Sequence, residues 1–258
     1  MAQLVGTDWV AARLENPAFT VVDPRRPMKY LLGHLPGAIN LPVYKLFGAD
    51  GGLLAPAALA DFIGGSGLGD DSTPVLYDSP EGQNAAMLAW ILEYLGRTGV
   101  HLMDAFFEAW KAGGREVRYK PVEAPARQFS VRTNPAIRAT LAEVRGARGL
   151  KFVDFRSREE FIGERSMGTD APGHIPGAVN LVWRDLASPP DRLLKPRDQI
   201  ERMLHHAGLS RADKIIAYCR SGPRASLGYL ALHQLGYDVR LFDGSWAEWS
   251  GAGLPAEK

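Results

Sequence analysis

The single cysteine of the sequence stands in the stretch "KIIAYCRSGPRAS", residues 214–226, between an apolar run and two arginines. A cysteine is nucleophilic as the thiolate, which backbone N–H groups, a helix N-terminus and nearby arginines stabilise. If residues 214–218 form a strand and a helix begins at Ala225, the loop from Cys219 to Arg224 gathers such groups around the sulfur. The stretch therefore predicts an anion-binding loop with Cys219 as its nucleophile.

The uncharged residues of the loop also suit a rigid anion pocket. Gly222 permits backbone conformations closed to other residues, Pro223 stiffens the turn, and the Ser221 hydroxyl can donate a hydrogen bond. The alternative is that a lone cysteine is a small buried hydrophobe. That alternative explains neither the glycine nor the two arginines close to it, so we favour the functional interpretation.

Two arginines in the loop offer positive charge to an anionic substrate. Arg220 follows the cysteine directly and Arg224 closes the loop. The sequence leaves open which of them faces the pocket, because Arg220 could instead point away and pair with a carboxylate such as Asp154 or Glu160. Both arginines are therefore candidate substrate-binding residues.

The loop belongs to one half of a duplicated chain. "GHLPGAINL" at 33–41 matches "GHIPGAVNL" at 173–181, and "LMDAFFEAW" at 102–110 matches "LFDGSWAEW" at 241–249. Before the first pair of blocks, "FTVVDPR" corresponds to "LKFVDFR". Because the blocks follow in the same order, the chain contains two copies of one unit.

Each copy alternates short apolar runs with helical patterns. Runs such as "FTVVD" and "KIIAYC" are typical of strands buried on both faces. Strand–helix alternation predicts an α/β unit with a mostly parallel sheet flanked by helices, and ligands of such sheets collect at the carboxyl ends of the strands. We expect a first domain at 1–115, a linker at 116–130 and a second domain at 131–258.

Composition excludes several classes of partner. The formal charge is +1, from 30 Lys and Arg against 29 Asp and Glu, so no bulk field attracts nucleic acid or an anionic membrane. The chain starts without a signal-peptide pattern and contains no long apolar stretch. One cysteine excludes an intrachain disulfide and indicates a reducing compartment. We expect a cytoplasmic protein that is a monomer.

The duplicated "GHxPGAxNL" block, the "D-x-R" strand ends, the "CRSGPR" loop and "DGSWAEW" together resemble the rhodanese family, specifically its tandem-domain sulfurtransferases. The resemblance implies two rhodanese-like domains, of which the second is catalytic. In the first, Asp78 stands near the cysteine position, so that domain is expected to be silent. The implied reaction moves a sulfane sulfur from thiosulfate or a related donor, through a Cys219 persulfide, to cyanide or a thiol, with no metal or organic cofactor.

Three other activities are compared with thiosulfate sulfur transfer: a cysteine phosphatase, a 3-mercaptopyruvate sulfurtransferase and a persulfide carrier. Phosphatases with a catalytic cysteine use a longer C-x5-R loop, whereas Cys219 to Arg224 is C-x4-R, which suits a single sulfur better than a phosphoryl group. A 3-mercaptopyruvate sulfurtransferase and a persulfide carrier that hands sulfur to a protein acceptor are the alternatives. Glu160 stands where some two-domain members carry a substrate-binding arginine, and a carboxylate there repels an anionic donor.

Residues outside the loop complete the predicted site. Asp154 and Arg156 end the strand beside which a substrate would lie. Asp154 would bond either the active loop or a local turn, and Arg156 is more typical of a structural ion pair. Trp246 is a candidate to line the pocket, although aromatic residues at this spacing usually pack helices. The "GHxPGA" histidine, His174, recurs in the silent half, which favours a role in the fold.

Overall fold

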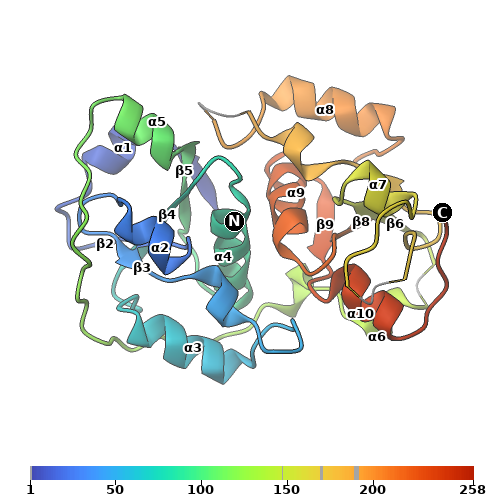
Figure 1. The fold of residues 1–258 in the computed structure, drawn as a ribbon, viewed down its shortest axis with the longest axis horizontal. Helices are drawn as coiled ribbons and strands as arrows, with labels where there is room; N and C mark the ends of the chain where they lie inside the picture. The colour runs from blue at the N-terminus through green and yellow to red at the C-terminus, as the bar shows by residue number, and fades with distance from the viewer. Residues whose placement is uncertain (1, 147, 169–170, 189–191) are drawn as a thin grey trace. The chain divides into compact units, whose positions relative to one another are not determined.

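The computed structural model describes residues 2–146, 148–168, 171–188 and 192–258 (Figure 1). Contacts between residues divide the chain into two compact units, Met1–Asn134 with Ser188–Leu193 and Pro135–Ala187 with Leu194–Lys258. Each unit contains a sheet of parallel strands flanked by helices. The α/β class and the tandem arrangement predicted from the sequence are therefore confirmed.

The sheet of the first unit has five parallel strands, in the order β1 (Gln3–Val5), β5 (His101–Phe106), β4 (Thr73–Asp78), β2 (Phe19–Asp23) and β3 (Ile39–Asn40). Its central strand β4 has an apolar middle, in which Val75, Leu76 and Tyr77 are all buried. Successive strand residues point to opposite faces, so this burial requires cover on both sides of the sheet.

Helices supply that cover. They are α1 (Thr7–Ala11), α2 (Pro27–Leu31), α3 (Pro56–Gly65), α4 (Gln83–Tyr94) and α5 (Phe107–Ala112), with a 3₁₀ turn η1 (Val43–Leu46). Val10 of α1 and Trp110 of α5 join Val21 and Met103 of the sheet in one core cluster. Figure 1 shows α3 on the opposite side of this sheet from α1 and α5. The first unit thus has three layers.

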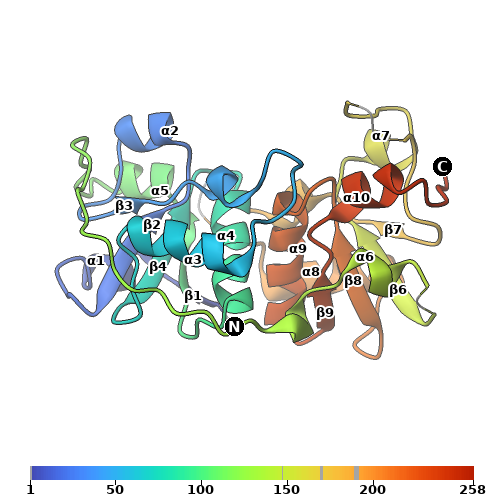
Figure 2. The ribbon, with the colours of Figure 1, turned by 90° about the horizontal axis from the view of Figure 1, so that it is seen from below.

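The second unit repeats the same topology. Its strands lie in the order β7 (Val179–Asn180), β6 (Leu150–Asp154), β8 (Lys214–Tyr218) and β9 (Asp238–Leu241), all parallel. This order corresponds to β3-β2-β4-β5 of the first unit, and Figure 2 shows β6, β8 and β9 side by side. In place of a strand like β1, Arg138 makes an isolated parallel bridge with Leu241.

The helices of the second unit also repeat the first. They are α6 (Leu141–Val144), α7 (Arg158–Phe161), α8 (Arg197–His206), α9 (Pro223–Gln234) and α10 (Ser245–Gly251), with 3₁₀ turns η2 (Pro135–Ile137) and η3 (Trp183–Leu186). Val144 of α6 and Trp249 of α10 share a core cluster with Phe152 and Tyr218 of the sheet. Figure 1 shows α8 on the opposite side of this sheet from α10.

The segment predicted as a linker, 116–130, packs on the first unit. Val117 lies against the core of that unit, and the Val122 N–H donates to the Tyr30 hydroxyl at 2.9 Å. Phe129 is buried. The segment has no helical or strand periodicity, so its scattered apolar residues give no sequence signal that they dock. In the structure, the first unit therefore extends beyond its predicted end.

All the helices are short. The two helices that follow the central strands, α4 and α9, have 12 residues each. Among the described residues, none of the helices has the length and apolar content that crossing a bilayer requires.

Candidate active site

Strand β8 carries Cys219 to the carboxyl end of the second sheet. It pairs in parallel with β6, so that Asp154 lies opposite Tyr218. Residues 215–218 are all buried, because helices cover both faces. Since Cys219 follows Tyr218 directly, its thiol lies at the edge where parallel sheets bind their ligands.

Helix α9 begins two residues earlier than predicted. The sequence suggests a start at Ala225, whereas Pro223 and Arg224 already belong to the first turn. Proline suits that position because its fixed φ is helical and its missing N–H has no partner within the helix. Gly222 precedes it with a φ of 103°, in the region that favours glycine. The connection is therefore only 219–222, tighter than the six-residue loop expected.

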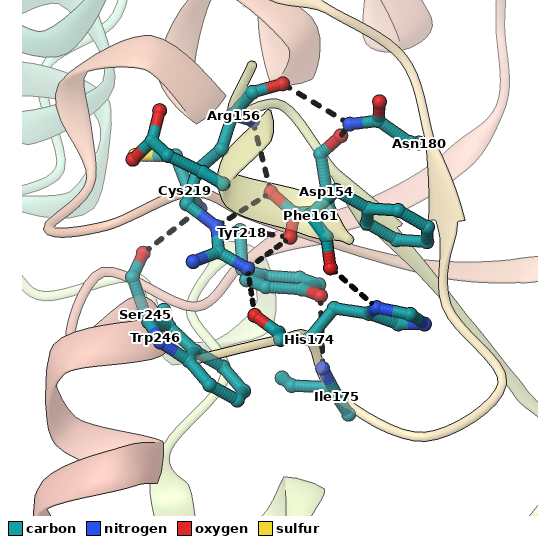
Figure 3. Close-up of polar contacts among 12 residues, drawn as sticks. Asp154, Arg156, Phe161, His174, Ile175, Asn180, Tyr218, Cys219, Ser245 and Trp246 are labelled. Atoms are coloured by element: carbon teal, nitrogen blue, oxygen red, sulfur yellow. Dashed lines mark hydrogen bonds and ion pairs between the residues drawn. The ribbon is translucent and has the colours of Figure 1, made fainter. Parts of the chain in front are cut away.

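The buried Cys219 is held from two sides, and Figure 3 shows its contact with Ser245. Its Sγ accepts a hydrogen bond from the Gly222 N–H at 3.2 Å. Its own backbone N–H donates instead to the Ser245 Oγ at 3.2 Å, and its carbonyl accepts from the Trp246 N–H at 3.0 Å. The start of α10 thus fixes the cysteine backbone, while the start of α9 supplies a donor to the sulfur.

Ser245 is a site residue that the sequence interpretation missed. It is the one non-glycine residue with a positive φ, 57°, in the part of the chain that the structure describes. Besides accepting from Cys219, its hydroxyl donates to the Phe242 carbonyl at 2.8 Å. The aligned residue of the first half is Phe106, whose φ is −101°. A serine that appears only in the half with the cysteine is the sequence signal that identifies it.

Arg224 and Glu160 form a two-point ion pair close to the cysteine. The two terminal guanidinium nitrogens lie 2.6 and 2.9 Å from the two carboxylate oxygens. Burial lowers the pKa of Arg224, but the hydrogen bond to Glu160 and the charges of Cys219 and Glu160 outweigh it and raise that pKa. Burial likewise raises the pKa of Glu160, and the hydrogen bond and charge of Arg224 outweigh it and lower that pKa. Both groups are therefore ionised at neutral pH.

Arg220 makes a different contact from the one suggested as its alternative. One of its terminal nitrogens donates to the Met167 carbonyl at 3.3 Å. The Glu160 carboxylate that could have held it pairs with Arg224 instead. Arg220 and the neighbouring Ser221 are both half-buried.

Asp154 and Arg156 form a buried ion pair with each other (Figure 3). The Arg156 side chain donates to both Asp154 oxygens, at 2.7 to 3.1 Å, and to the Gly173 carbonyl at 2.7 Å. Asp23 and Arg25 of the first half make the same contacts, with Gly33 in place of Gly173. Because the half without the cysteine has the same ion pair, we conclude that Asp154 and Arg156 stabilise the fold.

Trp246 lies in the core of the second unit. Its side chain is fully buried, and its Nε1–H donates to the Ala171 carbonyl at 3.0 Å. The Arg156 guanidinium carbon lies 4.8 Å from the centre of its ring. Its contribution to the site is to support Arg156 and, through its backbone N–H, the Cys219 carbonyl.

The histidines of the repeated block have a role in the fold, as their recurrence suggested. The His174 Nδ1 lies 2.7 Å from the Phe161 carbonyl, and its ring stacks on Phe161. His34 repeats this arrangement with Tyr30.

Two asparagines of the same repeated block were missed by the sequence interpretation. The Asn180 amide nitrogen donates to the Asp154 and Arg156 carbonyls at 2.9 and 3.0 Å. Asn40 makes the same two bonds in the first half, at the same distances. The signal was the conserved spacing of asparagine within the duplicated block.

In the first half, Asp78 occupies the place that Cys219 has in the second. Its carboxylate accepts from the backbone N–H groups of Ser79, Asn84 and Ala85 and from the Asn84 side chain. Burial raises the pKa of Asp78 to about 6, although these hydrogen bonds lower it. The donors at the start of α4 are thus satisfied by a side chain of the chain itself.

A shallow groove of about 650 Å³ lies along α8 in the second unit. It is lined by Asn180, Leu181, Lys195, Gln199, Arg202, Met203, His206 and Ala207. Because it includes neither Cys219 nor any other predicted site residue, we place the chemistry at the strand end and not in this groove.

Comparison with known proteins identifies the family. The model of the rhodanese-like domain matches twice, at residues 6–113 and 138–252. A thiosulfate sulfurtransferase of Corynebacterium glutamicum is 33% identical over 96% of this chain and 87% of its own. The sulfur carrier protein TtuD of Thermus thermophilus is 31% identical, over 99% and 96%. The crystal structure of SseA from Escherichia coli, a 3-mercaptopyruvate sulfotransferase, superposes with a TM-score of 0.86 at 26% identity, over 95% of this chain and 99% of SseA. The chain belongs to the rhodanese family, with two rhodanese-like domains in tandem.

Proposed function

We propose that the protein is a sulfurtransferase that carries a sulfane sulfur on Cys219, from thiosulfate or a related donor to cyanide or a thiol. The observation that carries this proposal is the position of the one thiol. Cys219 directly follows a central parallel strand, just before the N-terminus of α9, and the Gly222 nitrogen lies 3.2 Å from its sulfur. Backbone donors and a helix N-terminus stabilise an anionic sulfur before and after it receives a second sulfur atom.

The reaction has two steps that pass through a covalent intermediate. The Cys219 thiolate attacks the outer sulfur of thiosulfate, a new S–S bond forms, and sulfite leaves with the electron pair of the broken S–S bond. Cyanide or a thiolate then attacks the outer sulfur of the persulfide and regenerates the Cys219 thiolate. No net oxidation or reduction of the protein occurs over the cycle.

The other residues have distinct proposed roles. Gly222 and Pro223 shape the connection so that N–H groups face the sulfur, and Ser221 and Arg220 form the part of the loop that meets the donor. Arg224 closes the loop beside the sulfur, where its guanidinium is paired with Glu160. The Asp154–Arg156 pair and Trp246 are scaffold for the loop. The first domain carries no sulfur, because a carboxylate at Asp78 cannot form a persulfide.

Named relatives support both the main proposal and an alternative. Thiosulfate sulfurtransferase is the name of the Corynebacterium relative, and SseA is a 3-mercaptopyruvate sulfotransferase, so mercaptopyruvate is a second candidate donor. The Thermus relative is named a sulfur carrier protein. A carrier would form the persulfide but release it only to a specific acceptor protein, without turnover on cyanide.

The test separates these outcomes. The protein is incubated with thiosulfate and analysed by mass spectrometry for a gain of about 32 Da, one sulfur atom, on Cys219. Cyanide is then added and thiocyanate is measured over many turnovers. Cys219→Ser should abolish both signals while circular dichroism shows an unchanged fold.

Each result has one meaning. Mass gain with multiple turnover supports the transferase, and mass gain without turnover supports the carrier. No mass gain with thiosulfate or mercaptopyruvate would refute the sulfur-transfer proposal. Turnover that survives Cys219→Ser would place the nucleophile elsewhere.

We include a reducing compartment, the cytoplasm, and a monomeric state in the proposal. The one cysteine must alternate between thiolate and persulfide, and a reducing environment keeps it from forming intermolecular disulfides. Cell fractionation tests the location, and sedimentation of the purified chain tests the monomer.

A further inference from the structure

The charge beside Cys219 is cancelled by a carboxylate from another element. Arg224 is in the first turn of α9, and Glu160 is in α7, 64 residues earlier in the chain. The Arg224 side chain is 21% exposed and the Glu160 side chain 7%. With two hydrogen bonds and little water around them, the two charges act as one neutral unit toward anything that approaches the sulfur.

Glu160 is fixed in this position independently of Arg224. It is the third residue of a capping box at the start of α7, in which the Ser157 N–H donates to Glu160 at 3.2 Å and the Glu160 N–H donates to the Ser157 Oγ at 3.4 Å. The carboxylate therefore does not have to be recruited by the arginine, and the pair costs little additional side-chain ordering.

The duplication shows that this pair accompanies the cysteine. The first-half counterpart of Glu160 is the exposed Lys29, and that of Arg224 is Asn84, whose side chain donates to Asp78. By contrast, the scaffold pairs of the two halves are alike, as described above for Asp154 and Arg156. Glu160 and Arg224 thus differ from the scaffold in being specific to the domain with the thiol.

We propose that Glu160 is a specificity-determining residue, which cancels the charge of Arg224 and so makes the site discriminate against donors of high negative charge. This inference rests on the proposed sulfur transfer and names the class of donor. The favoured donors are organic sulfane compounds with one negative charge or none, such as thiosulfonates and organic persulfides. Neutralisation of Arg224 raises their kcat/KM relative to that of the thiosulfate dianion.

Two donors of the same chemistry isolate the charge. Methanethiosulfonate, CH₃SO₂S⁻, differs from thiosulfate by a methyl group in place of one oxygen anion. Cys219 thiolate attacks the outer sulfur of either donor, forms the Cys219 S–S bond, and releases methanesulfinate or sulfite with the electron pair of the broken bond. The persulfide product is the same, and the intrinsic difference between the two leaving groups is the same in every variant, so it cancels when variants are compared.

The experiment measures kcat/KM for both donors with cyanide as acceptor, in wild type and in Glu160→Gln. Glutamine keeps the capping box and one oxygen for Arg224 but leaves the guanidinium charge uncompensated. We expect the thiosulfate-to-methanethiosulfonate ratio of kcat/KM to rise about tenfold, and this rise to shrink with added salt. A change in the reactivity of Cys219 itself affects both donors alike and cancels in the ratio.

Two further variants control the result. Glu159→Gln makes the same change in net charge at the neighbouring exposed position, and we expect its ratio to stay within about twofold of wild type. Arg224→Gln leaves Glu160 without its cation, so the ratio should move in the opposite direction, against thiosulfate. Circular dichroism and thermal unfolding show whether each variant is folded.

The outcomes are distinct from those of the proposed function. If wild type forms a Cys219 persulfide but the ratio is the same in wild type and Glu160→Gln, the specificity inference is wrong while sulfur transfer stands. An equal shift in Glu159→Gln also overturns the inference, because the effect would then be one of net charge alone. If neither donor forms the persulfide in wild type, the proposed function itself fails.

Discussion

Ser245, the first residue of α10, has a left-handed backbone and holds the amide of Cys219 with its hydroxyl. Its hydroxyl accepts the Cys219 N–H at 3.2 Å and donates to the Phe242 carbonyl at 2.8 Å, all within the core. Ser245→Ala deletes only the hydroxyl and so removes both hydrogen bonds. We expect the Cys219 backbone to lose its fixed position, and with it the alignment between the sulfur and the Gly222 N–H.

The magnitude follows from the two backbone groups that lose a partner. Each costs about 1–3 kcal/mol when buried, so the free energy of unfolding of the second domain should fall by about 2–6 kcal/mol in Ser245→Ala. The φ of 57° at Ser245 allows a second comparison, between the alanine and glycine variants. A left-handed conformation costs a residue with a Cβ about 1–2 kcal/mol. Ser245→Gly should therefore be more stable than Ser245→Ala by about 1 kcal/mol, although both lack the hydroxyl.

Urea unfolding followed by tryptophan fluorescence gives the stabilities, and hydrogen exchange of the peptide containing Cys219 reports its amide directly. We expect faster exchange and at least a tenfold loss of kcat/KM in Ser245→Ala, which corresponds to about 1.4 kcal/mol. Ser66→Ala is the control, because the Ser66 hydroxyl bonds only back to the Phe62 carbonyl of its own helix in the first unit. The reasoning is refuted if Ser245→Ala loses no more stability than Ser66→Ala, or if Ser245→Gly is less stable than Ser245→Ala.

Two further predictions concern the paired features of the two halves. Burial raises the pKa of Asp78 to about 6 from 3.8, so its favourable contribution to stability is present below pH 4 and is lost as the pH rises through 6. The stability of wild type relative to Asp78→Asn should then fall by about 3 kcal/mol over that range in pH-dependent unfolding, and a difference independent of pH would contradict this. Asn180→Ala and Asn40→Ala each leave two backbone carbonyls without their side-chain donor, the carbonyls of Asp154 and Arg156 in the case of Asn180. Both should lose about 1–3 kcal/mol of stability, but only Asn180→Ala should slow persulfide formation in stopped-flow measurements, and equal slowing by both would show that the effect is not local.

Much of the fold could be predicted because the chain repeats itself. The matched blocks "GHLPGAINL" and "GHIPGAVNL" establish two copies, and the doubly buried strands give a parallel sheet with helices on both faces. The boundaries were harder. Residues 116–130 dock on the first unit through isolated apolar residues, which carry no periodic signal. The start of α9 at Pro223 depends on how Gly222 and the proline share one tight turn.

For the site, the residue types indicated the chemistry but not the pairing. Cys219 at a strand end beside a glycine and two arginines predicts an anionic sulfur site from local sequence alone. Which arginine faces a carboxylate depends on Glu160, which lies 64 residues from Arg224 and is brought to it by α7. The sequence interpretation offered Arg220 as a partner of that carboxylate, and the structure gives it to Arg224.

The sequence by itself determined the duplication, the class of fold and the one residue able to carry sulfur, because these depend on local pattern and on composition. Only the tertiary structure decided what surrounds the sulfur: Ser245 from 26 residues downstream holds the cysteine amide, and Glu160 neutralises Arg224. The physical reason is that hydrogen bonds and ion pairs act over a few ångströms, and the folded backbone alone determines which distant side chains come within that range.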